Sequence, residues 1–214
     1  MADHASQIGV IMKTGILGGT FNPIHTGHLI LAENAYDMIG LDQVLFVPSG
    51  VSYLKDQDEI VSASDRIRMV ELAIERNPHF ALSTIETDRD GNSYTYETIQ
   101  VLKAKNPDDE LYFLGGADIL LSIHTWMKPE IIFEHAALVI APRNDTDPVL
   151  LQERKAALEE EYSAKIVLLN TTDLEISSTD LRERIARGHS VRYYIPDPVL
   201  EYIREHQLYK RGER

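Results

Sequence analysis

The sequence predicts an α/β fold in which a mostly parallel sheet carries helices on both faces. Short apolar runs recur along the chain, and each is followed by a stretch with helical periodicity, which is typical of parallel strands joined by helical crossovers. The 214 residues are 43% hydrophobic, enough to bury one sizeable core. No internal repeat or low-complexity tract breaks the pattern. We therefore expect residues 13–214 to form a single domain, preceded by a flexible extension at residues 1–12.

The first half of the chain contains the elements that begin the sheet. Apolar periodicity and turn residues define each of them. A long stretch at 48–62 has no clear period, so we expect a loop there that could cover a site. The expected elements are a strand at 14–17, a helix at 29–39 ended by Gly40, a strand at 44–47 stopped by Pro48, a helix beginning near 62–65, a strand at 80–82, a helix at 95–105 and a strand at 111–114.

The second half continues the alternation. We expect a strand at 137–141, a helix at 150–162, a strand at 166–169 and two closing helices. The run Ser177-Ser178-Thr179-Asp180 predicts a capping box at the start of one closing helix. For the other, Asp197 is the expected N-cap and Pro198 the first-turn proline.

Composition and charge exclude several classes of protein. With 21 basic and 34 acidic residues the formal charge is −13, which is the wrong sign for a chain that grips nucleic acid through a broad basic surface. The chain has no cysteine, so neither disulfides nor a Cys-based zinc site is available. No apolar run approaches the roughly 20 residues of a membrane helix, and the start lacks a targeting pattern. We expect a cytoplasmic protein with no membrane or nucleic-acid partner.

A glycine turn and a histidine pair follow the first predicted strand. Gly18, Gly19, Thr20 and Phe21 allow the backbone to approach a ligand closely, and the next helix points its free N–H groups at the same place, so an anion is expected there. His25 and His28 lie three residues apart on the first turn of that helix, where both imidazoles can reach one bound group. Gly27 leaves room for a ribose or phosphate. The structural alternative is a pair of exposed or core histidines.

A second candidate phosphate site lies near the other end of the chain. The hydroxyls of Ser177, Ser178 and Thr179, the free N–H groups of a helix start, and Arg182 one turn inside can surround phosphate oxygens. Taken alone, this run is equally compatible with an ordinary helix cap. Together the two sites predict a clamp around a triphosphate.

Both motifs resemble signatures of one superfamily. The run from Gly18 to His28 is similar to the first signature of the nucleotidyltransferases that have a histidine pair on a Rossmann-like sheet, and the run from Ile176 to Arg182 is similar to the second. Within that superfamily the chain most resembles the bacterial nicotinate-nucleotide adenylyltransferases. The likeness extends from Lys13 to Tyr209 and includes Ser93 to Tyr96, Gly115 to Asp118, Trp126, Ile195 to Asp197 and Gln207 to Tyr209.

The resemblance implies an activity and a set of site residues. The adenylyl group of ATP would pass to nicotinate mononucleotide, giving nicotinate adenine dinucleotide and pyrophosphate for NAD biosynthesis. His25 and His28 would be catalytic, and Lys55, Thr95 and Trp126 would bind the mononucleotide. No protein metal site is implied, and Mg²⁺ would be bound mainly through the substrate phosphates. The implied ATP-binding residues are Gly18, Gly19, Thr20, Phe21, Gly27, Gly115, Asp118, Arg143, Ser177, Ser178, Thr179 and Arg182.

Two departures from the family pattern and several alternatives stay open. Val51 to Lys55 keeps only the lysine of a Pro-Pro-His-Lys-like run, and Met127 stands where an aromatic residue is common. Nicotinamide mononucleotide or another phosphorylated acceptor remains an alternative substrate, and a non-catalytic nucleotide-binding module is an alternative function. A dinucleotide-dependent oxidoreductase is disfavoured because the glycine turn lacks the G-x-G-x-x-G spacing. The sequence is compatible with a homo-oligomer.

Overall fold

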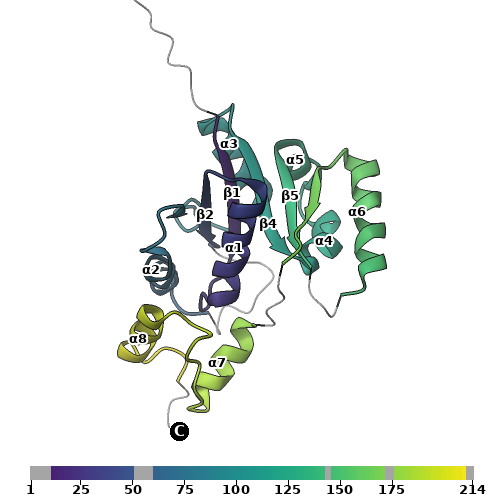
Figure 1. Ribbon diagram of the computed structural model, residues 1–214. Coiled ribbons are helices and arrows are strands. Elements are labelled where there is room, and N and C mark those ends of the chain that lie inside the picture. Colours follow the sequence, from purple (N-terminus) through teal and green to yellow (C-terminus); the bar gives the residue numbers. More distant parts are fainter. Residues whose placement is uncertain (1–10, 51–59, 143–145, 172–175, 211–214) are drawn as a thin grey trace, which may run out of the picture.

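The computed structural model describes residues 11–50, 60–142, 146–171 and 176–210 (Figure 1). Its centre is one six-stranded sheet in the order β3-β2-β1-β4-β5-β6, in which every neighbouring pair is parallel. The predicted parallel α/β sheet is thus confirmed. The strands are β1 (Lys13–Gly19), β2 (Gln43–Pro48), β3 (Phe80–Leu82), β4 (Glu110–Gly116), β5 (Ala136–Ala141) and β6 (Ile166–Leu168).

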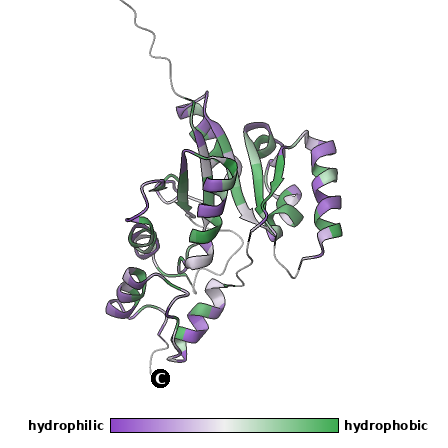
Figure 2. Ribbon diagram, viewed as in Figure 1, coloured by the Kyte–Doolittle hydropathy of each residue, from purple (hydrophilic) through white to green (hydrophobic). Residues whose placement is uncertain are grey.

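Helices cover both faces of this sheet, and the side-chain alternation of the strands divides the core between them. In β1, Leu17 belongs to a cluster with Ala32 and Met69, whereas its neighbour Ile16 packs in a second cluster with Ile99. Figure 2 shows the strands mostly hydrophobic and the outer helices striped. The helices are α1 (Thr26–Ile39), α2 (Ala63–Ile74), α3 (Thr95–Lys105), α4 (Ala117–Ser122), the 3₁₀ helix η2 (Ile123–Thr125), α5 (Pro129–His135), α6 (Pro148–Tyr162), α7 (Ser178–Ala186) and α8 (Asp197–Glu205).

The element boundaries refine the sequence-based expectations. β1 extends two residues beyond the predicted strand, because Gly18 and Gly19 pair with Val47 and Pro48 of β2. Pro48 is therefore the last residue of β2 rather than the first residue after it. The short helices α4 and α5 were not predicted, since six or seven residues are too few to show helical periodicity. None of the described helices is long and apolar enough to span a membrane.

The helix starts were predicted unevenly. The helix start expected near 62–65 is confirmed: Ser62 is the N-cap of α2, and its hydroxyl oxygen accepts from the Asp65 N–H at 3.1 Å. The capping box predicted for α7 is wrong, because Ser177 is the N-cap residue but makes no side-chain capping bond. At α8 the expected N-cap is also wrong: Pro196 has an extended backbone, so the helix begins at Asp197 itself.

The strand order places a crevice at the carboxyl ends of β1 and β4. From β1 the chain continues outward to β2 and β3, and it then crosses back so that β4 pairs with the other edge of β1. Ligands of open α/β sheets bind where the order reverses in this way. α7 and α8 lie beyond the same ends of the strands (Figure 1). The sheet therefore positions any site between β1, β4 and the start of α7.

Candidate active site

A cavity of about 630 Å³ occupies this crevice and gathers most of the predicted site residues. Its volume is in the usual range for small-molecule and cofactor sites. The predicted residues that line it are Gly18, Gly19, Thr20, Phe21, His25, Gly27, His28, Gly115, Asp118, Ser177, Ser178, Thr179 and Arg182. The two sequence motifs, far apart along the chain, therefore meet in one cavity.

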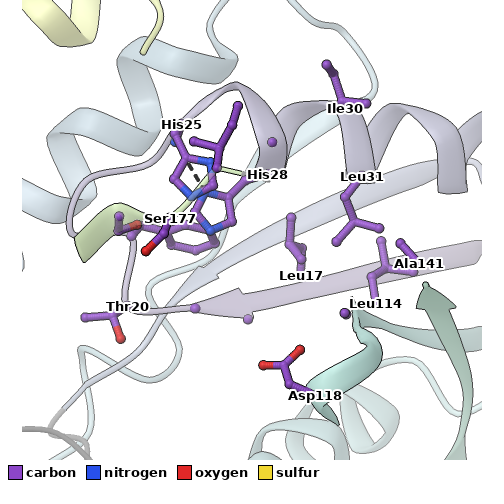
Figure 3. Close-up of a pocket in the computed structure, with 18 of the residues that line it drawn as sticks. Leu17, Thr20, His25, His28, Ile30, Leu31, Leu114, Asp118, Ala141 and Ser177 are labelled. Carbon is purple, nitrogen blue, oxygen red and sulfur yellow. Dashed lines mark hydrogen bonds between the residues drawn. The ribbon is translucent and has the colours of Figure 1, made fainter. Parts of the chain in front are cut away.

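The histidine pair is stacked at one end of the cavity (Figure 3). The ring centroids of His25 and His28 are 3.7 Å apart, with an interplanar angle of 27°. The sequence placed His25 on the first helical turn, and this is wrong. His25 is the N-cap residue, with an extended backbone, and α1 begins at Thr26. The pair faces one site because an N-cap residue and the third helical residue lie side by side.

The backbone fixes the protonation pattern of His28. Its Nδ1 accepts a hydrogen bond from the backbone N–H of His25 at 3.2 Å. A ring nitrogen that accepts carries no proton, so the neutral imidazole of His28 has its proton on Nε2. The edge of the ring also packs against buried Phe21, with ring centroids 5.1 Å apart. His28 is thus oriented to present an N–H donor.

The start of α7 is fastened to the segment just before α1. The hydroxyl of Ser178 donates to the carbonyl oxygen of Pro23 at 2.9 Å, and Nη1 of Arg182 donates to that of Asn22 at 3.0 Å. A hydroxyl has one proton, so in this arrangement Ser178 can offer a phosphate its backbone N–H but not its O–H. The guanidinium of Arg182 has five N–H donors and can hold Asn22 and a phosphate together.

The side of the cavity away from the imidazoles is mostly apolar. In Figure 3, Leu17, Ile30, Leu31, Leu114 and Ala141 line the side away from the imidazoles, and the carboxylate of Asp118 lies at the start of α4. Asp118 is not a helix cap, because Gly116 holds the N-cap position of α4. One end of the cavity thus offers donors for phosphates, and the other an apolar surface with a carboxylate for a nucleoside.

Sequence reasoning missed the apolar wall that α1 contributes. The motif ends at His28, but Ile30, Leu31 and Asn34 also line the cavity. Residues three and four apart share one face of a helix, so continuing that spacing from Gly27 would have found them. Thr171 carries no comparable signal, because its place in the lining depends on how the last part of the chain returns to the sheet.

None of the residues predicted to hold the mononucleotide is in the described lining of this cavity. Thr95 is the first residue of α3, and Trp126 follows η2 with its ring edge-on to Phe113 at 6.1 Å between centroids. Lys128 Nζ lies 4.7 Å from the ring centroid of Tyr96, so the start of α3 and the segment after η2 are neighbours. Lys55 and Arg143 lie outside the described residues.

The end of β2 connects these two regions. The Ser49 N–H donates to the carbonyl oxygen of Gly19 at 2.8 Å, which joins β2 to the end of β1. At the next residue, a Cβ added to Gly50 would lie 2.5 Å from both the Glu86 carbonyl oxygen and Ser93 Oγ. Gly50 therefore allows close packing of β2 against the segment that leads into α3.

A buried polar network connects the segment before α3 to that helix. The hydroxyl of Thr98 donates to Glu86 Oε1 at 2.8 Å and accepts from Arg89 Nη2 at 2.6 Å. Burial raises the pKa of Glu86, while the hydrogen bond from Thr98 and the charge of Arg89 oppose the shift. The network ties the 86–89 segment to the first turns of α3, where Thr95 lies.

Comparison with known proteins agrees with this geometry. Residues 16–184 match the family model described as cytidylyltransferase-like. A relative from Lachnoclostridium phytofermentans, named "Probable nicotinate-nucleotide adenylyltransferase", is 45% identical over 92% of this chain and 98% of its own length. One of the same name from Dehalococcoides mccartyi strain CBDB1 is 42% identical over 94% and 99%. The chain belongs to the nicotinate-nucleotide adenylyltransferase family. It is therefore a nucleotidyltransferase.

Solved structures show the same fold. The chain superposes with a TM-score of 0.77 on Plasmodium falciparum nicotinic acid mononucleotide adenylyltransferase complexed with NaAD, covering 92% of this chain and 97% of that one. The same enzyme complexed with APC gives a TM-score of 0.75. Sequence identity is 20% in both cases, so this likeness concerns the fold.

The family's nucleotide chemistry raises the question of a metal. Within the described parts of the chain, no group of three or more His, Asp or Glu side chains is arranged to hold a metal ion. Asp118 is the carboxylate residue in the described lining of the cavity. Mg²⁺ usually keeps several waters and is bound through one or two carboxylates and substrate phosphates, which this donor set fits.

Proposed function

We propose that this enzyme transfers the adenylyl group of ATP to nicotinate mononucleotide. The products are nicotinate adenine dinucleotide and pyrophosphate, a step of NAD biosynthesis. The observation that carries the proposal is the meeting of the stacked His25–His28 pair with the start of α7 in one cavity at the ends of β1 and β4. The names of relatives that are 38% to 45% identical over nearly the whole chain support the choice of acceptor.

The reaction is a direct in-line displacement. A phosphate oxygen of the mononucleotide attacks the α-phosphorus of ATP, the new P–O bond forms, and the bond to the β-phosphate oxygen breaks to release pyrophosphate. Catalysis consists of holding two anions in line and stabilising the charge that develops on the phosphate oxygens. No covalent bond to the protein is needed, and none of the lining residues is placed as a nucleophile in this scheme.

Each part of the cavity has a proposed role. His28 donates from Nε2 to an α-phosphate oxygen, and His25 supports the same group. The backbone N–H groups at the start of α7, with Thr179 and Arg182, hold the β- and γ-phosphates. Mg²⁺ bound mainly through the phosphates would offset their negative charge. Gly115 and Asp118 face the ribose.

The acceptor is proposed to lie toward α3 and η2. Trp126 stacks on the pyridine ring and Thr95 supplies hydrogen bonds at the start of α3. Lys55 and Arg143, which lie outside the described residues, are retained as proposed contacts with the mononucleotide and with ATP. Because β2 joins the phosphate end to the start of α3 through Ser49 and Gly50, an acceptor placed there could reach the α-phosphorus.

One assay tests the proposal. Purified enzyme is given ATP, Mg²⁺ and either nicotinate mononucleotide or nicotinamide mononucleotide, and pyrophosphate release is measured for each. We expect the higher kcat/KM with the nicotinate form. A preference for the amide would correct the acceptor, and the absence of pyrophosphate with both would overturn the proposed function. Omission of Mg²⁺ in a parallel reaction should abolish release.

A further inference from the structure

An arginine outside the described cavity lining holds the phosphate-binding turn. Arg66 lies on the core-facing side of α2 and is only 4% exposed. Its Nη1 donates to the carbonyl oxygen of Thr20 at 2.9 Å, across 46 residues of sequence. Thr20 itself lines the cavity, two residues after the start of the glycine pair. A remote helix therefore contacts the loop that must meet the phosphates.

Among the described residues, no ion pair accounts for the burial of Arg66. A buried guanidinium is costly unless it is paired, and stable examples usually have a carboxylate partner. Within the described residues Arg66 forms no salt bridge, and its Nε has no hydrogen-bond partner. Burial lowers the pKa of Arg66, opposed by the nearby Tyr209. Within the described part of the chain, the Thr20 carbonyl is the hydrogen-bond acceptor of this guanidinium.

A second contact comes from the end of the chain. The hydroxyl of Tyr209 donates to Asn22 Oδ1 at 2.9 Å, and the Val61 N–H donates to the same oxygen at 3.3 Å. Asn22 is 3% exposed, so these bonds are shielded from water. Two residues of the turn are therefore held from the side of α2 and the C-terminal segment.

The turn needs such support because its middle residue is strained. Phe21 has a φ of 49°, a left-handed conformation that costs a residue with a Cβ about 1–2 kcal/mol. Strained residues persist where the surrounding structure over-determines them. Thr20 and Asn22, on either side of Phe21, are the two residues that Arg66 and Tyr209 hold.

The bond to the Thr20 carbonyl also sets the direction of the next N–H. The Thr20–Phe21 peptide is not among the cis bonds, and in a trans peptide the C=O and the following N–H point in opposite directions. Because the carbonyl is directed at Arg66, the Phe21 N–H is directed away from α2. Phe21 lines the cavity, so its orientation controls how the turn meets an anion.

We propose that Arg66 and Tyr209 are positioning residues for nucleotidyl transfer, which hold the Thr20–Asn22 turn in its strained conformation from outside the cavity. The inference rests on the proposed function for its effect on turnover. A misplacement of about 1 Å can cost about 10²-fold in rate. Arg66→Met should therefore lower kcat/KM for ATP by about that factor. Arg66→Lys should recover part of it, since a lysine also offers the carbonyl a charged donor. Tyr209→Phe removes a single hydrogen bond and should cost about tenfold.

Two readouts are needed, because either variant could simply destabilise the fold. The first is kcat/KM for ATP, measured well below the melting temperature and corrected for the folded fraction. The second is amide hydrogen exchange of residues 18–22 in the free protein, which should become faster in both variants. Arg68→Met on the same helix, with a 52% exposed side chain, is the control for Arg66, and Tyr202→Phe, whose hydroxyl bonds Asp65, is the control for Tyr209.

The outcomes separate this inference from the proposed function. In Arg66→Met and in Tyr209→Phe, both kcat/KM and hydrogen exchange must change relative to the control variant. If one of these two readouts stays at the control value, the positioning role of that residue is overturned. If the wild type releases no pyrophosphate, the proposed function fails. The rise in melting temperature caused by a non-hydrolysable ATP analogue then replaces kcat/KM as the first readout.

Discussion

The phosphate end of the site is held mainly through backbone carbonyls, whereas the end assigned to the mononucleotide is held through side chains. At the first, the carbonyl oxygens of Gly19, Asn22 and Pro23 accept from β2 and α7. At the second, Thr98 links Glu86 to Arg89. Backbone geometry depends on short local patterns, so the phosphate end has a strong sequence signature, while side-chain networks join residues scattered along the chain.

This difference also predicts how the two ends respond to mutation. Changes at the phosphate end should affect the chemical step, because that end contacts the atoms whose charge changes. Changes at the other end should affect the affinity for one substrate or the stability of the fold. Measurements of kcat and of KM for each substrate can therefore sharpen or break the comparison.

The largest effect is expected from His28→Ala. Removing a donor that acts on developing charge typically lowers kcat by about 10²–10³-fold. ATP binding should fall far less, because only the transition state needs the full strength of that donor. Steady-state kinetics and calorimetric ATP binding check this, with exposed His206→Ala as the control. Equal losses in kcat and affinity would leave His28 with a binding role alone.

Gly27→Ala should come next, with a fall in kcat/KM of about 10- to 100-fold. A Cβ at this position would lie 3.1 Å from Nδ1 of His25, so the imidazole must shift by a few tenths of an ångström from its place beside His28. Alanine is favoured over glycine within a helix by about 1 kcal/mol, so the melting temperature should not fall. A loss of activity together with a lower melting temperature would point to general damage instead.

Trp126→Ala should act on one substrate only. Loss of a stacked aromatic contact worth about 0.5–1.5 kcal/mol predicts a rise of about 2- to 13-fold in KM for nicotinate mononucleotide. The KM for ATP should stay unchanged, and Trp126→Phe should keep most of the affinity. If both KM values rise together, Trp126 supports the core near Phe113 rather than the ligand.

The smallest effect concerns Glu86, whose pKa burial raises above the ordinary value of 4.5. The folded state then binds the proton more tightly than the unfolded state, so stability is highest below pH 4.5 and falls as pH rises through the raised pKa. Glu86→Gln removes this loss, so the variant should be more stable than the wild type at pH 8 and should not differ from it near pH 4. Melting temperatures between pH 4 and 8 test this; a constant difference at all pH values contradicts it.

Much of the fold followed from sequence patterns because its strands and long helices are strongly periodic. The helix at 95–105 and the strand at 80–82 were predicted to the residue. α4 and α5 could not be found, since they are shorter than the window in which periodicity appears. The helix caps were less predictable, because whether Ser177 bonds its own helix depends on the neighbours that the fold supplies.

The sequence alone predicted most of the residues that line the cavity, because the glycine pair, the histidine pair and the start of α7 are recognisable from short local patterns. Only the tertiary structure decided that Ser178 gives its O–H to Pro23 and that Arg66 reaches the Thr20 carbonyl. These contacts join residues between 46 and 155 positions apart. No local pattern encodes such a contact, since it exists only after parallel strand pairing has brought the segments together.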